Sequence, residues 1–252
     1  MKTLGILGLG EVGRAIEKLA KRKFRVVARD VAMDQFRGNS IDILHICIPY
    51  SEDFIQIVCK TIQEVKPELV IIDSTIAIGT TRKIIKRTGS SVAHCPIMGV
   101  HPDLAKHQKI FTKVVGVEDK RMFKKVMLHW KKLGAGEVIK FDRPEESEAA
   151  KLLSTTYYAW NIVFNKIVKR MSNEKRINFD QVYTVFNKIY NEGYSKISPQ
   201  VVRPVLKHVD GKIGGHCVIP NARILLDFYE EEWIKKIVDF NGTLGDEKES
   251  KE

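Results

Sequence analysis

The chain has 252 residues, 44% of them hydrophobic, which is enough to bury one large core or two modest ones. No run approaches the roughly 18 apolar residues of a membrane span, and four well-separated cysteines without a secretory signal indicate reduced thiols. The net charge of +11 favours anionic ligands, but the basic residues are spread over helix faces without a nucleic-acid motif. We therefore expect a cytoplasmic protein without nucleic-acid or membrane partners.

The first half of the chain alternates strand-like runs with helical patterns. Strands are expected at residues 3–7, 25–28, 43–48, 69–73, 91–94, 113–117 and 137–141. Apolar residues at helical spacing lie between them, at residues 11–21, 51–65, 80–87 and 121–133. Such alternation predicts βαβ units, in which a parallel sheet is covered by helices on its faces.

The pattern changes at Pro144, after which no strand-like run appears. Long helical segments are expected at residues 145–171, 178–192 and 221–240, whereas residues 241–252 carry glycines and charges without periodicity. We predict an all-helical second domain over residues 144–240, followed by a disordered tail at 241–252. Its long apolar faces exceed what a small domain needs to bury, which predicts a homodimer through these helices.

A glycine-rich motif connects the first strand to the first helix. Gly8-Leu9-Gly10-Glu11-Val12-Gly13 lies where a dinucleotide-binding fingerprint would lie. Its first glycine permits a tight turn, its second lets the backbone approach a pyrophosphate, and its third lets the helix pack against the strand. We therefore predict a Rossmann-type domain over residues 1–143, with the pyrophosphate held at the start of this helix, next to Glu11 and Val12.

The end of the second predicted strand bears on the choice of cofactor. Asp30 follows Gly13 by 17 residues, where a carboxylate would accept hydrogen bonds from the adenosine ribose hydroxyls. This favours NAD over NADP. The neighbouring Arg29 leaves NADP open, because an arginine at this place could pair with a 2′-phosphate.

Three further motifs, taken with the glycine loop, resemble the family of UDP-glucose, UDP-N-acetylmannosamine and GDP-mannose dehydrogenases. They are Asp73-Ser74-Thr75-Ile76-Ala77-Ile78-Gly79-Thr80-Thr81, then Glu148-Ala149-Ala150-Lys151 continuing to Asn165, and finally Gly214-Gly215-His216-Cys217. The resemblance implies a Rossmann domain, a helical domain, NAD as cofactor and a catalytic cysteine at Cys217. The resemblance implies that this chain is a truncated, divergent relative, because the family's C-terminal nucleotide-sugar domain has no counterpart in this sequence.

The sequence departs from the family pattern at three positions that bear on chemistry. Ile97 stands where the family has the glutamate of an S-P-E segment, and Thr155 where it has an asparagine. Asn221 stands where it has an aspartate, four residues after the cysteine. Since the glutamate and the aspartate belong to the family's double oxidation, we expect this chain to perform that reaction poorly, if at all.

Cys217 is the candidate nucleophile. Two glycines precede it, and it lies near the start of a predicted helix, whose N-terminus would stabilise a thiolate. In the family, the thiolate adds to an aldehyde, and a second hydride transfer gives a thioester that water cleaves. The alternative interpretation is a small buried apolar residue, which is how we interpret Cys47, Cys59 and Cys95.

Lys151, Asn165 and Thr75 complete the candidate catalytic set. Lys151 and Asn165 share a helix face, from which the lysine would stabilise an oxyanion as charge develops during hydride transfer; a solvated lysine is the alternative. Thr75 ends a strand at the edge where parallel sheets bind ligands, although Ser74 and Thr75 could equally cap the next helix. His94, His101 and His216 are acid–base candidates by residue type alone, and no spacing indicates a metal site.

The leading hypothesis is therefore an NAD-dependent dehydrogenase that oxidises a hydroxyl of a small substrate resembling a nucleotide sugar. A second hypothesis is a two-electron dehydrogenase of the β-hydroxyacid or prephenate type, which also pairs a Rossmann domain with a helical one. A third is a non-catalytic NAD-binding sensor or partner subunit.

Overall fold

The computed structural model describes residues 1–214 and 217–249. It divides into two compact units, Met1–Lys151 and Leu152–Glu252. The boundary expected between residues 143 and 144 marks the start of the long helix α6 (Pro144–Lys175), whereas the two units divide two turns further along this helix. Each unit is described by itself.

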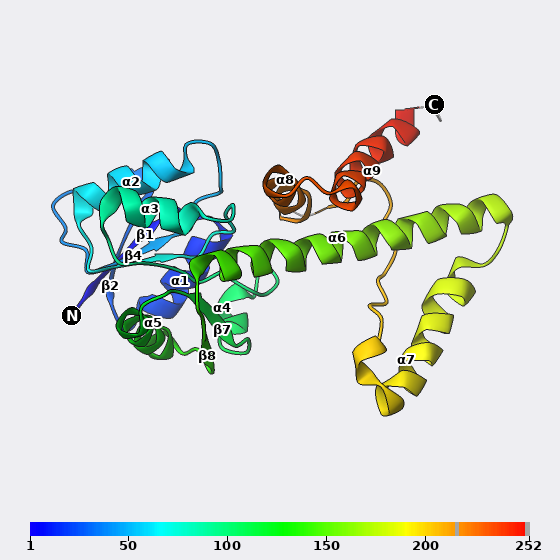
Figure 1. Ribbon diagram of the computed structural model, residues 1–252, viewed down its shortest axis with the longest axis horizontal. Coiled ribbons are helices and arrows are strands. Elements are labelled where there is room, and N and C mark those ends of the chain that lie inside the picture. Colours follow the sequence, from blue (N-terminus) through cyan, green and yellow to red (C-terminus); the bar gives the residue numbers. More distant parts are fainter. Residues whose placement is uncertain (215–216, 250–252) are drawn as a thin grey trace. The chain divides into compact units, whose positions relative to one another are not determined.

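The first unit contains one eight-stranded sheet (Figure 1). Its strands lie in the order β3-β2-β1-β4-β5-β6-β7-β8, and β2, β1, β4, β5 and β6 are parallel neighbours. Their bounds are β1 Thr3–Leu7, β2 Arg25–Asp30, β3 Met33–Asp34, β4 Ile43–Ile46, β5 Leu69–Ile72, β6 Val92–His94, β7 Lys113–Gly116 and β8 Val138–Phe141. The predicted strands and the Rossmann-type architecture are confirmed.

The sheet is not parallel throughout, which corrects the sequence-based prediction. The unpredicted strand β3 runs antiparallel to β2, because the two-residue turn at residues 31–32 can only reverse the chain. β7 is antiparallel to β6 through the single pair His94 and Gly116, while β8 is parallel to β7.

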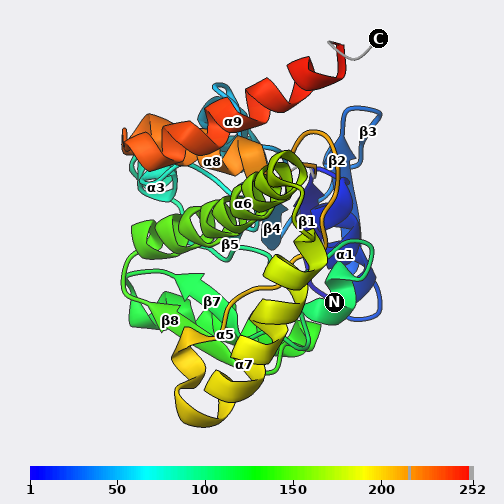
Figure 2. The same cartoon turned by 90° about the vertical axis from the view of Figure 1, so that its right-hand side faces the viewer.

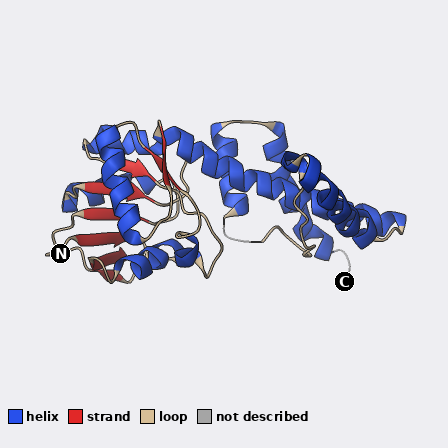
Figure 3. Cartoon of the chain, turned by 90° about the horizontal axis from the view of Figure 1, so that it is seen from below, coloured by secondary structure: helices blue, strands red, loops and turns tan. Residues whose placement is uncertain are grey.

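Five helices cover the two faces of the sheet, as the strand–helix alternation predicts (Figures 1 and 3). Their bounds are α1 Glu11–Ala20, α2 Phe54–Val65, α3 Thr80–Thr88, α4 Leu104–His107 and α5 Lys120–Leu133. Helices α1, α4 and α5 share one apolar core with the sheet, and α2 and α3 share the other. Only the four-residue α4 was not predicted.

The second unit is helical, as predicted. After α6 come a π-helical turn (Asp180–Val185), α7 (Phe186–Ile197), a short 3-10 turn (Pro199–Val201), α8 (Val218–Phe228) and α9 (Glu232–Glu249). Helices α8 and α9 lie side by side (Figures 1 and 2). None of the described helices combines the length and the apolar character that crossing a bilayer requires.

One prediction about the helices of the C-terminal part is wrong. The segment expected to form one helix over 221–240 forms two, because Tyr229 leaves the helical region with φ −138° and ψ 100°. Of the tail predicted at residues 241–252, the structure describes residues 241–249, as a continuation of α9. The last three residues of the predicted tail lie outside the described part of the chain.

Candidate functional site

The glycine loop between β1 and α1 has no room for side chains at two of its glycines. Gly8 has a φ of +94°, and a Cβ built on Gly13 would lie 1.9 Å from the carbonyl oxygen of Gly8. A Cβ built on Gly10, in contrast, meets no atom of the described residues within 4 Å. The loop therefore packs tightly against α1 and leaves open space in front of that helix, which suits a pyrophosphate group.

A cavity of about 380 Å³ runs along one side of α1 and reaches the glycine loop at Gly10. It is lined by Gly10, Glu11, Arg14, Ala15, Lys18, His101, Pro102 and Ala105. Arg14 and Lys18 supply positive charge, while Glu11 lies 3.7 Å from the imidazole of His101. The backbone cradle thus opens onto a space with cationic side chains.

Asp30 lies beside this loop at the end of β2. Its carboxylate accepts hydrogen bonds from the backbone N–H groups of Leu9 and Val31. These bonds, that of Leu9 first, lower the pKa of Asp30, so the side chain is a fixed anion next to the glycine loop. Such a carboxylate fits the ribose hydroxyls of an adenine dinucleotide.

The guanidinium of Arg29 is already engaged. It forms two hydrogen bonds with the carboxylate of Glu64, at 2.6 and 2.8 Å, and one of 2.9 Å with Asp34, which raises its pKa. It also stacks on the ring of Phe36 at 4.7 Å. A guanidinium with two carboxylate partners is poorly placed to bind a 2′-phosphate.

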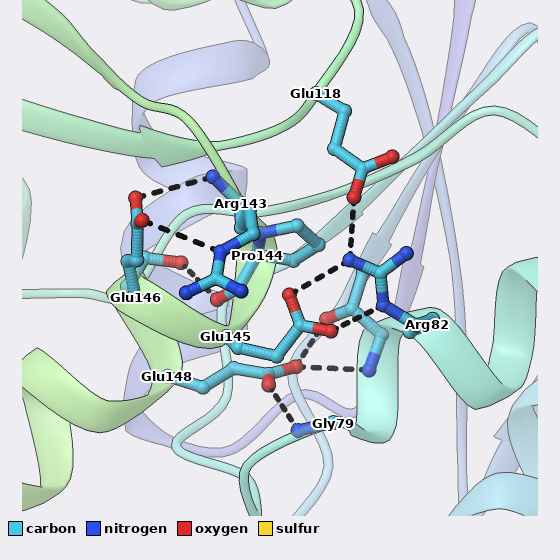
Figure 4. Close-up of polar contacts among 10 residues, drawn as sticks. Gly79, Arg82, Glu118, Arg143, Pro144, Glu145, Glu146 and Glu148 are labelled. Atoms are coloured by element: carbon cyan, nitrogen blue, oxygen red, sulfur yellow. Dashed lines mark hydrogen bonds and ion pairs between the residues drawn. The ribbon is translucent and has the colours of Figure 1, made fainter.

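Glu148 connects two of the motifs that carry the family resemblance, its own motif on α6 and the motif at residues 73–81. The buried carboxylate of Glu148 accepts hydrogen bonds from the N–H of Gly79 at 2.6 Å, and from the N–H and hydroxyl of Thr81 at 2.8 and 2.6 Å (Figure 4). It caps the N-terminus of α3 from the first turns of α6. Two motifs that are far apart in the sequence are therefore contact partners, a role for Glu148 that sequence reasoning missed.

An ion-pair network reinforces the same junction (Figure 4). Arg82 of α3 contacts the carboxylates of Glu145 on α6 and Glu118 after β7. The start of α6 is thereby held to α3 and to the sheet.

Replacing Glu148 by glutamine should reduce the free energy of unfolding by about 1–3 kcal/mol, because the amide NH₂ would face N–H groups that need an acceptor. Urea unfolding followed by circular dichroism measures this. The matched control is Glu146→Gln, since the hydrogen bonds of the Glu146 carboxylate to described residues go to the neighbouring Arg143, at 3.2 and 3.4 Å. Equal stability of the two variants would contradict the capping role.

Ser147 ties α6 to the strand β6. Its hydroxyl lies 2.7 Å from Nδ1 of the buried His94, whose Nε2 lies 3.1 Å from the carbonyl oxygen of Ser74. Burial lowers the pKa of His94 to about 3, so this imidazole is a neutral structural link. Lys151 follows Ser147 by one helical turn on the same face of α6, and its charge also acts on His94. Lys151 therefore lies near the carboxyl end of β6.

Thr75 lies half-buried just beyond β5, at the same edge of the sheet. The hydroxyl of Ser74 donates to the carbonyl oxygens of Ile46 and Ile48, at 3.2 and 2.6 Å. Because the N-cap of α3 is Gly79, the alternative that Ser74 or Thr75 caps this helix is wrong.

A buried polar chain crosses the core between the sheet and α5. Oδ2 of Asp73 lies 2.6 Å from Nδ1 of His45, and Nε2 of His45 lies 2.8 Å from Nε2 of His129. Burial lowers the pKa of His129 to about 2. No sequence pattern predicts this network, because its three members lie far apart in the chain.

Lys113 is buried next to the same network, contrary to the ordinary expectation for lysine. Its ammonium donates to the carbonyl oxygen of Pro96 at 3.1 Å and lies 3.9 Å from the ring centre of Trp130. Burial lowers its pKa to about 8, and the charge of Lys151 acts in the same direction. Lys113 and Lys151 therefore concentrate positive charge at this edge of the sheet.

In the helical unit, Asn165 holds a chain segment in place. Its side-chain NH₂ donates to the carbonyl oxygen of Leu206 at 3.0 Å, and its oxygen lies 2.9 Å from Nδ1 of His208. The nitrogen and the oxygen of the amide thus both contact the segment that leads to Gly214.

Thr155 and Asn221, which both depart from the family pattern, are hydrogen-bonded to each other. The side-chain NH₂ of Asn221 donates to the hydroxyl of Thr155 at 3.1 Å, and this hydroxyl donates to the carbonyl oxygen of Leu152 at 3.0 Å. The two replacements therefore form a neutral hydrogen-bonded pair that links α8 to α6. Cys217, one turn before Asn221, is the N-cap residue of α8 and is exposed.

The other three cysteines, Cys47, Cys59 and Cys95, are buried, as predicted. His216 lies outside the described residues. Within residues 1–214 and 217–249, no group of three or more histidine, cysteine or acidic side chains is arranged to hold a metal ion.

Comparison with known proteins identifies the fold. Neither a protein-family model nor a curated protein matches the sequence. Among solved structures, UDP-D-ManNAc dehydrogenase from Pyrococcus horikoshii is similar over 96% of this chain and 68% of its own, with a TM-score of 0.78 and 19% identity. A UDP-glucose dehydrogenase from Pyrobaculum islandicum matches 94% of this chain and 67% of its own, with a TM-score of 0.70 and 21% identity.

A third structure differs in the share of its length that is matched. The 3-hydroxyisobutyrate dehydrogenase from Mycobacterium tuberculosis is similar over 96% of this chain and 93% of its own, with a TM-score of 0.69 and 14% identity. The chain therefore has the fold that these dehydrogenase structures share, and the resemblance drawn from its motifs is confirmed at the level of the fold.

Proposed function

We propose that this protein is an NAD-dependent oxidoreductase that oxidises a hydroxyl group of a small substrate resembling a nucleotide sugar. The observation that carries the proposal is the pairing of the side-chain-free glycine loop with the anionic Asp30 beside it. The structural similarity to dehydrogenases named for UDP-sugars supports the substrate class.

The residues at the glycine loop fit an adenine dinucleotide. The backbone of residues 8–13, including Glu11 and Val12, would hold the pyrophosphate, and Asp30 would bind the ribose hydroxyls. The pairing of Arg29 with Glu64 and Asp34 favours NAD over NADP. When bound, NAD accepts a hydride from the substrate carbon.

Lys151 and Thr75 would act on the substrate oxygen. Thr75 lies beyond β5 and Lys151 near the end of β6, at the edge where open sheets bind ligands. The ammonium of Lys151 would stabilise the negative charge that develops on the hydroxyl oxygen as its proton passes to solvent water. The hydrogen bonds of Glu148 to α3 and of Ser147 to His94 hold the turn of α6 that precedes this lysine.

In the helical unit, Cys217 would add as a thiolate to a carbonyl carbon of the oxidised substrate. Its exposure and its place at the N-terminus of α8 support this role. Asn165, proposed from the sequence as a catalytic residue, would contribute by positioning the segment at residues 206–214. The free thiols also support a cytoplasmic location.

A second candidate is a two-electron dehydrogenase of small hydroxyacids. It is favoured by the neutral hydrogen-bonded pair of Asn221 and Thr155, because these residues replace the aspartate and the asparagine of the sugar-nucleotide family pattern. The 3-hydroxyisobutyrate dehydrogenase shares the fold. In this case Cys217 would be dispensable.

The function is tested by a thermal-shift screen of nucleotide sugars and hydroxyacids in the presence of NAD, followed by an assay of NADH formation. Turnover of a member of either class identifies the substrate and separates the two candidates. If the protein binds NADH tightly but oxidises none of the nucleotide sugars or hydroxyacids tested, the result supports the non-catalytic sensor and contradicts both enzymatic hypotheses.

We further propose that the protein is a homodimer that associates through α6. Half-exposed apolar side chains recur on α6 at alternating spacings of four and three residues: Leu153, Tyr157, Trp160, Phe164, Ile167 and Met171. This 3.5-residue period is the pattern by which two helices pack along a seam. A second copy of the same helix fits such a stripe.

Light scattering at micromolar concentration should give twice the mass of one chain, and Phe164→Glu should give the monomer. Phe228→Glu is the matched control, because Phe228 is 54% exposed, close to the 53% of Phe164, but lies at the end of α8 outside the stripe. A monomeric wild-type protein would refute the dimer.

A further inference from the structure

The segment that follows β6 forms one wall of the cavity beside the glycine loop. It comprises residues 96–108, includes α4, and is called the wall segment below. Its residues His101, Pro102 and Ala105 line the cavity that reaches the loop at Gly10. The position of the wall segment therefore sets the size of the space in which the proposed cofactor would lie.

Lys113, the first residue of β7, holds the wall segment from inside the core. Its ammonium group donates to the carbonyl oxygen of Pro96 at 3.1 Å and to the side-chain oxygen of Gln108 at 3.4 Å. These are the first and the last residue of the wall segment, so one side chain ties its two ends together. The antiparallel pairing of β7 with β6 makes this possible, because it places the start of β7 beyond the carboxyl end of β6.

Gln108 extends this tie into the wall segment. Its side-chain NH₂ donates to the carbonyl oxygens of Met98 at 2.6 Å and Leu104 at 3.2 Å. Gln108 is itself buried, so these contacts lie on the inner side of the segment. Polar contacts from both halves of the wall segment thus converge on Gln108 and, through it, on the ammonium of Lys113.

The ammonium of Lys113 is a charge inside the core, over the ring of Trp130. The titratable groups that face it are Asp73, Cys47, Cys95, His94 and Lys151. The thiols and the imidazole are neutral, because burial raises the pKa of the thiols and lowers that of the imidazole. Asp73 therefore attracts the ammonium, and Lys151 repels it.

We propose that Lys113 is a positioning residue of the nucleotide site, whose ammonium group holds the wall segment in the place that NAD binding requires. A wall that is fixed before binding spares the complex the cost of ordering it. The inference rests on the proposed function, because it takes the cavity beside the glycine loop as part of the NAD site.

The charge of Lys113 gives this role a measurable signature. A hydrogen bond donated by an ammonium group is stronger than one donated by a neutral amine. Because burial lowers the pKa of Lys113 to about 8, the tie to Pro96 and Gln108 should weaken as the pH rises through this value. The affinity for NADH should fall over the same range of pH.

The test is fluorescence titration of the full chain with NADH between about pH 6.5 and pH 9.5. Wild-type affinity should fall about tenfold across this range, the effect of losing a hydrogen bond to a charged group. Lys113→Met should bind about tenfold more weakly than the wild type at pH 7 and show no further fall. Gln108→Leu should also bind more weakly, but it keeps the ammonium and should therefore keep the fall.

Hydrogen exchange of residues 96–108 without NADH separates the position of the wall segment from general stability. Lys113→Met and Gln108→Leu should exchange faster there than the wild type. Val126→Ala is the control, because it removes two buried methyl groups from α5 and should lower the urea midpoint. It should leave NADH affinity and the exchange of the wall segment as in the wild type.

An NADH affinity of Lys113→Met equal to that of the wild type at pH 7 would overturn the proposal, as would the same pH-dependent fall in both proteins. Should Lys113→Met fail to fold, a wild-type affinity that does not change with pH, or an unaltered affinity of Gln108→Leu, would overturn it. A wild type that binds no NADH would overturn the proposed function, and the exchange measurement would then decide separately whether Lys113 holds the wall segment.

Discussion

Lys151→Met should lower kcat by a factor of about 10² to 10³, the usual loss when a group that stabilises developing oxyanion charge is removed. The affinity for NADH should not change, because Lys151 lies on α6 rather than at the glycine loop. Stopped-flow measurement of NADH formation, with the substrate that the screen identifies, gives both quantities.

Two further variants make this test specific. Lys120→Met removes an exposed lysine from the start of α5 and should leave kcat unchanged. Lys151→Arg keeps the charge and should recover part of the activity. A Lys151→Met enzyme with wild-type kcat would show that this lysine is only a solvated helix residue.

If Cys217 is the nucleophile, Cys217→Ser should retain NADH binding but stop the reaction after the first hydride transfer, with the aldehyde as product. A serine hydroxyl is a far weaker nucleophile than a thiolate, so the second hydride transfer should slow by about 10³-fold or more. Because Ile97 and Asn221 replace the family's glutamate and aspartate, the wild type should hydrolyse its thioester slowly and accumulate covalent enzyme. Chromatography of the products, together with the ratio of NADH formed to substrate consumed, measures this directly.

Chemical labelling supplies the control for Cys217. Iodoacetamide should modify this exposed thiol before the buried Cys47, Cys59 and Cys95, and bound substrate should protect it. Since exposure alone would produce faster labelling, the protection is the informative part. If Cys217→Ser forms the same product at the wild-type rate, the cysteine is structural and the enzyme performs a single oxidation.

The sequence was sufficient for the strands and most helices, because their patterns are local. Apart from Thr3, the run Thr3–Leu7 has no polar side chain, as expected of a strand buried on both faces, and it coincides with β1. The break between α8 and α9 has no such signal, because apolar residues continue at helical spacing through Phe228 and Trp233. Tertiary packing decides a break of this kind.

The polar contacts of the candidate site were less predictable, because they join residues distant in sequence. The glycine loop and Asp30 follow from a known spacing, and the structure places them side by side. Glu148 was visible only as part of a motif, and its contact with Thr81 spans 67 positions. The burial of Lys113 is set by the ring of Trp130 and the carbonyl of Pro96, which no sequence pattern relates to it.

The central claim is that the glycine loop and Asp30 bind NAD, and fluorescence titration with NADH and NADPH tests it most directly. The wild-type protein should bind NADH more tightly than NADPH. Asp30→Ala should weaken NADH binding by about 1–3 kcal/mol, the range for a hydrogen bond to a charged group. Wild-type preference for NADPH, or NADH affinity that is unchanged in Asp30→Ala, would contradict the account.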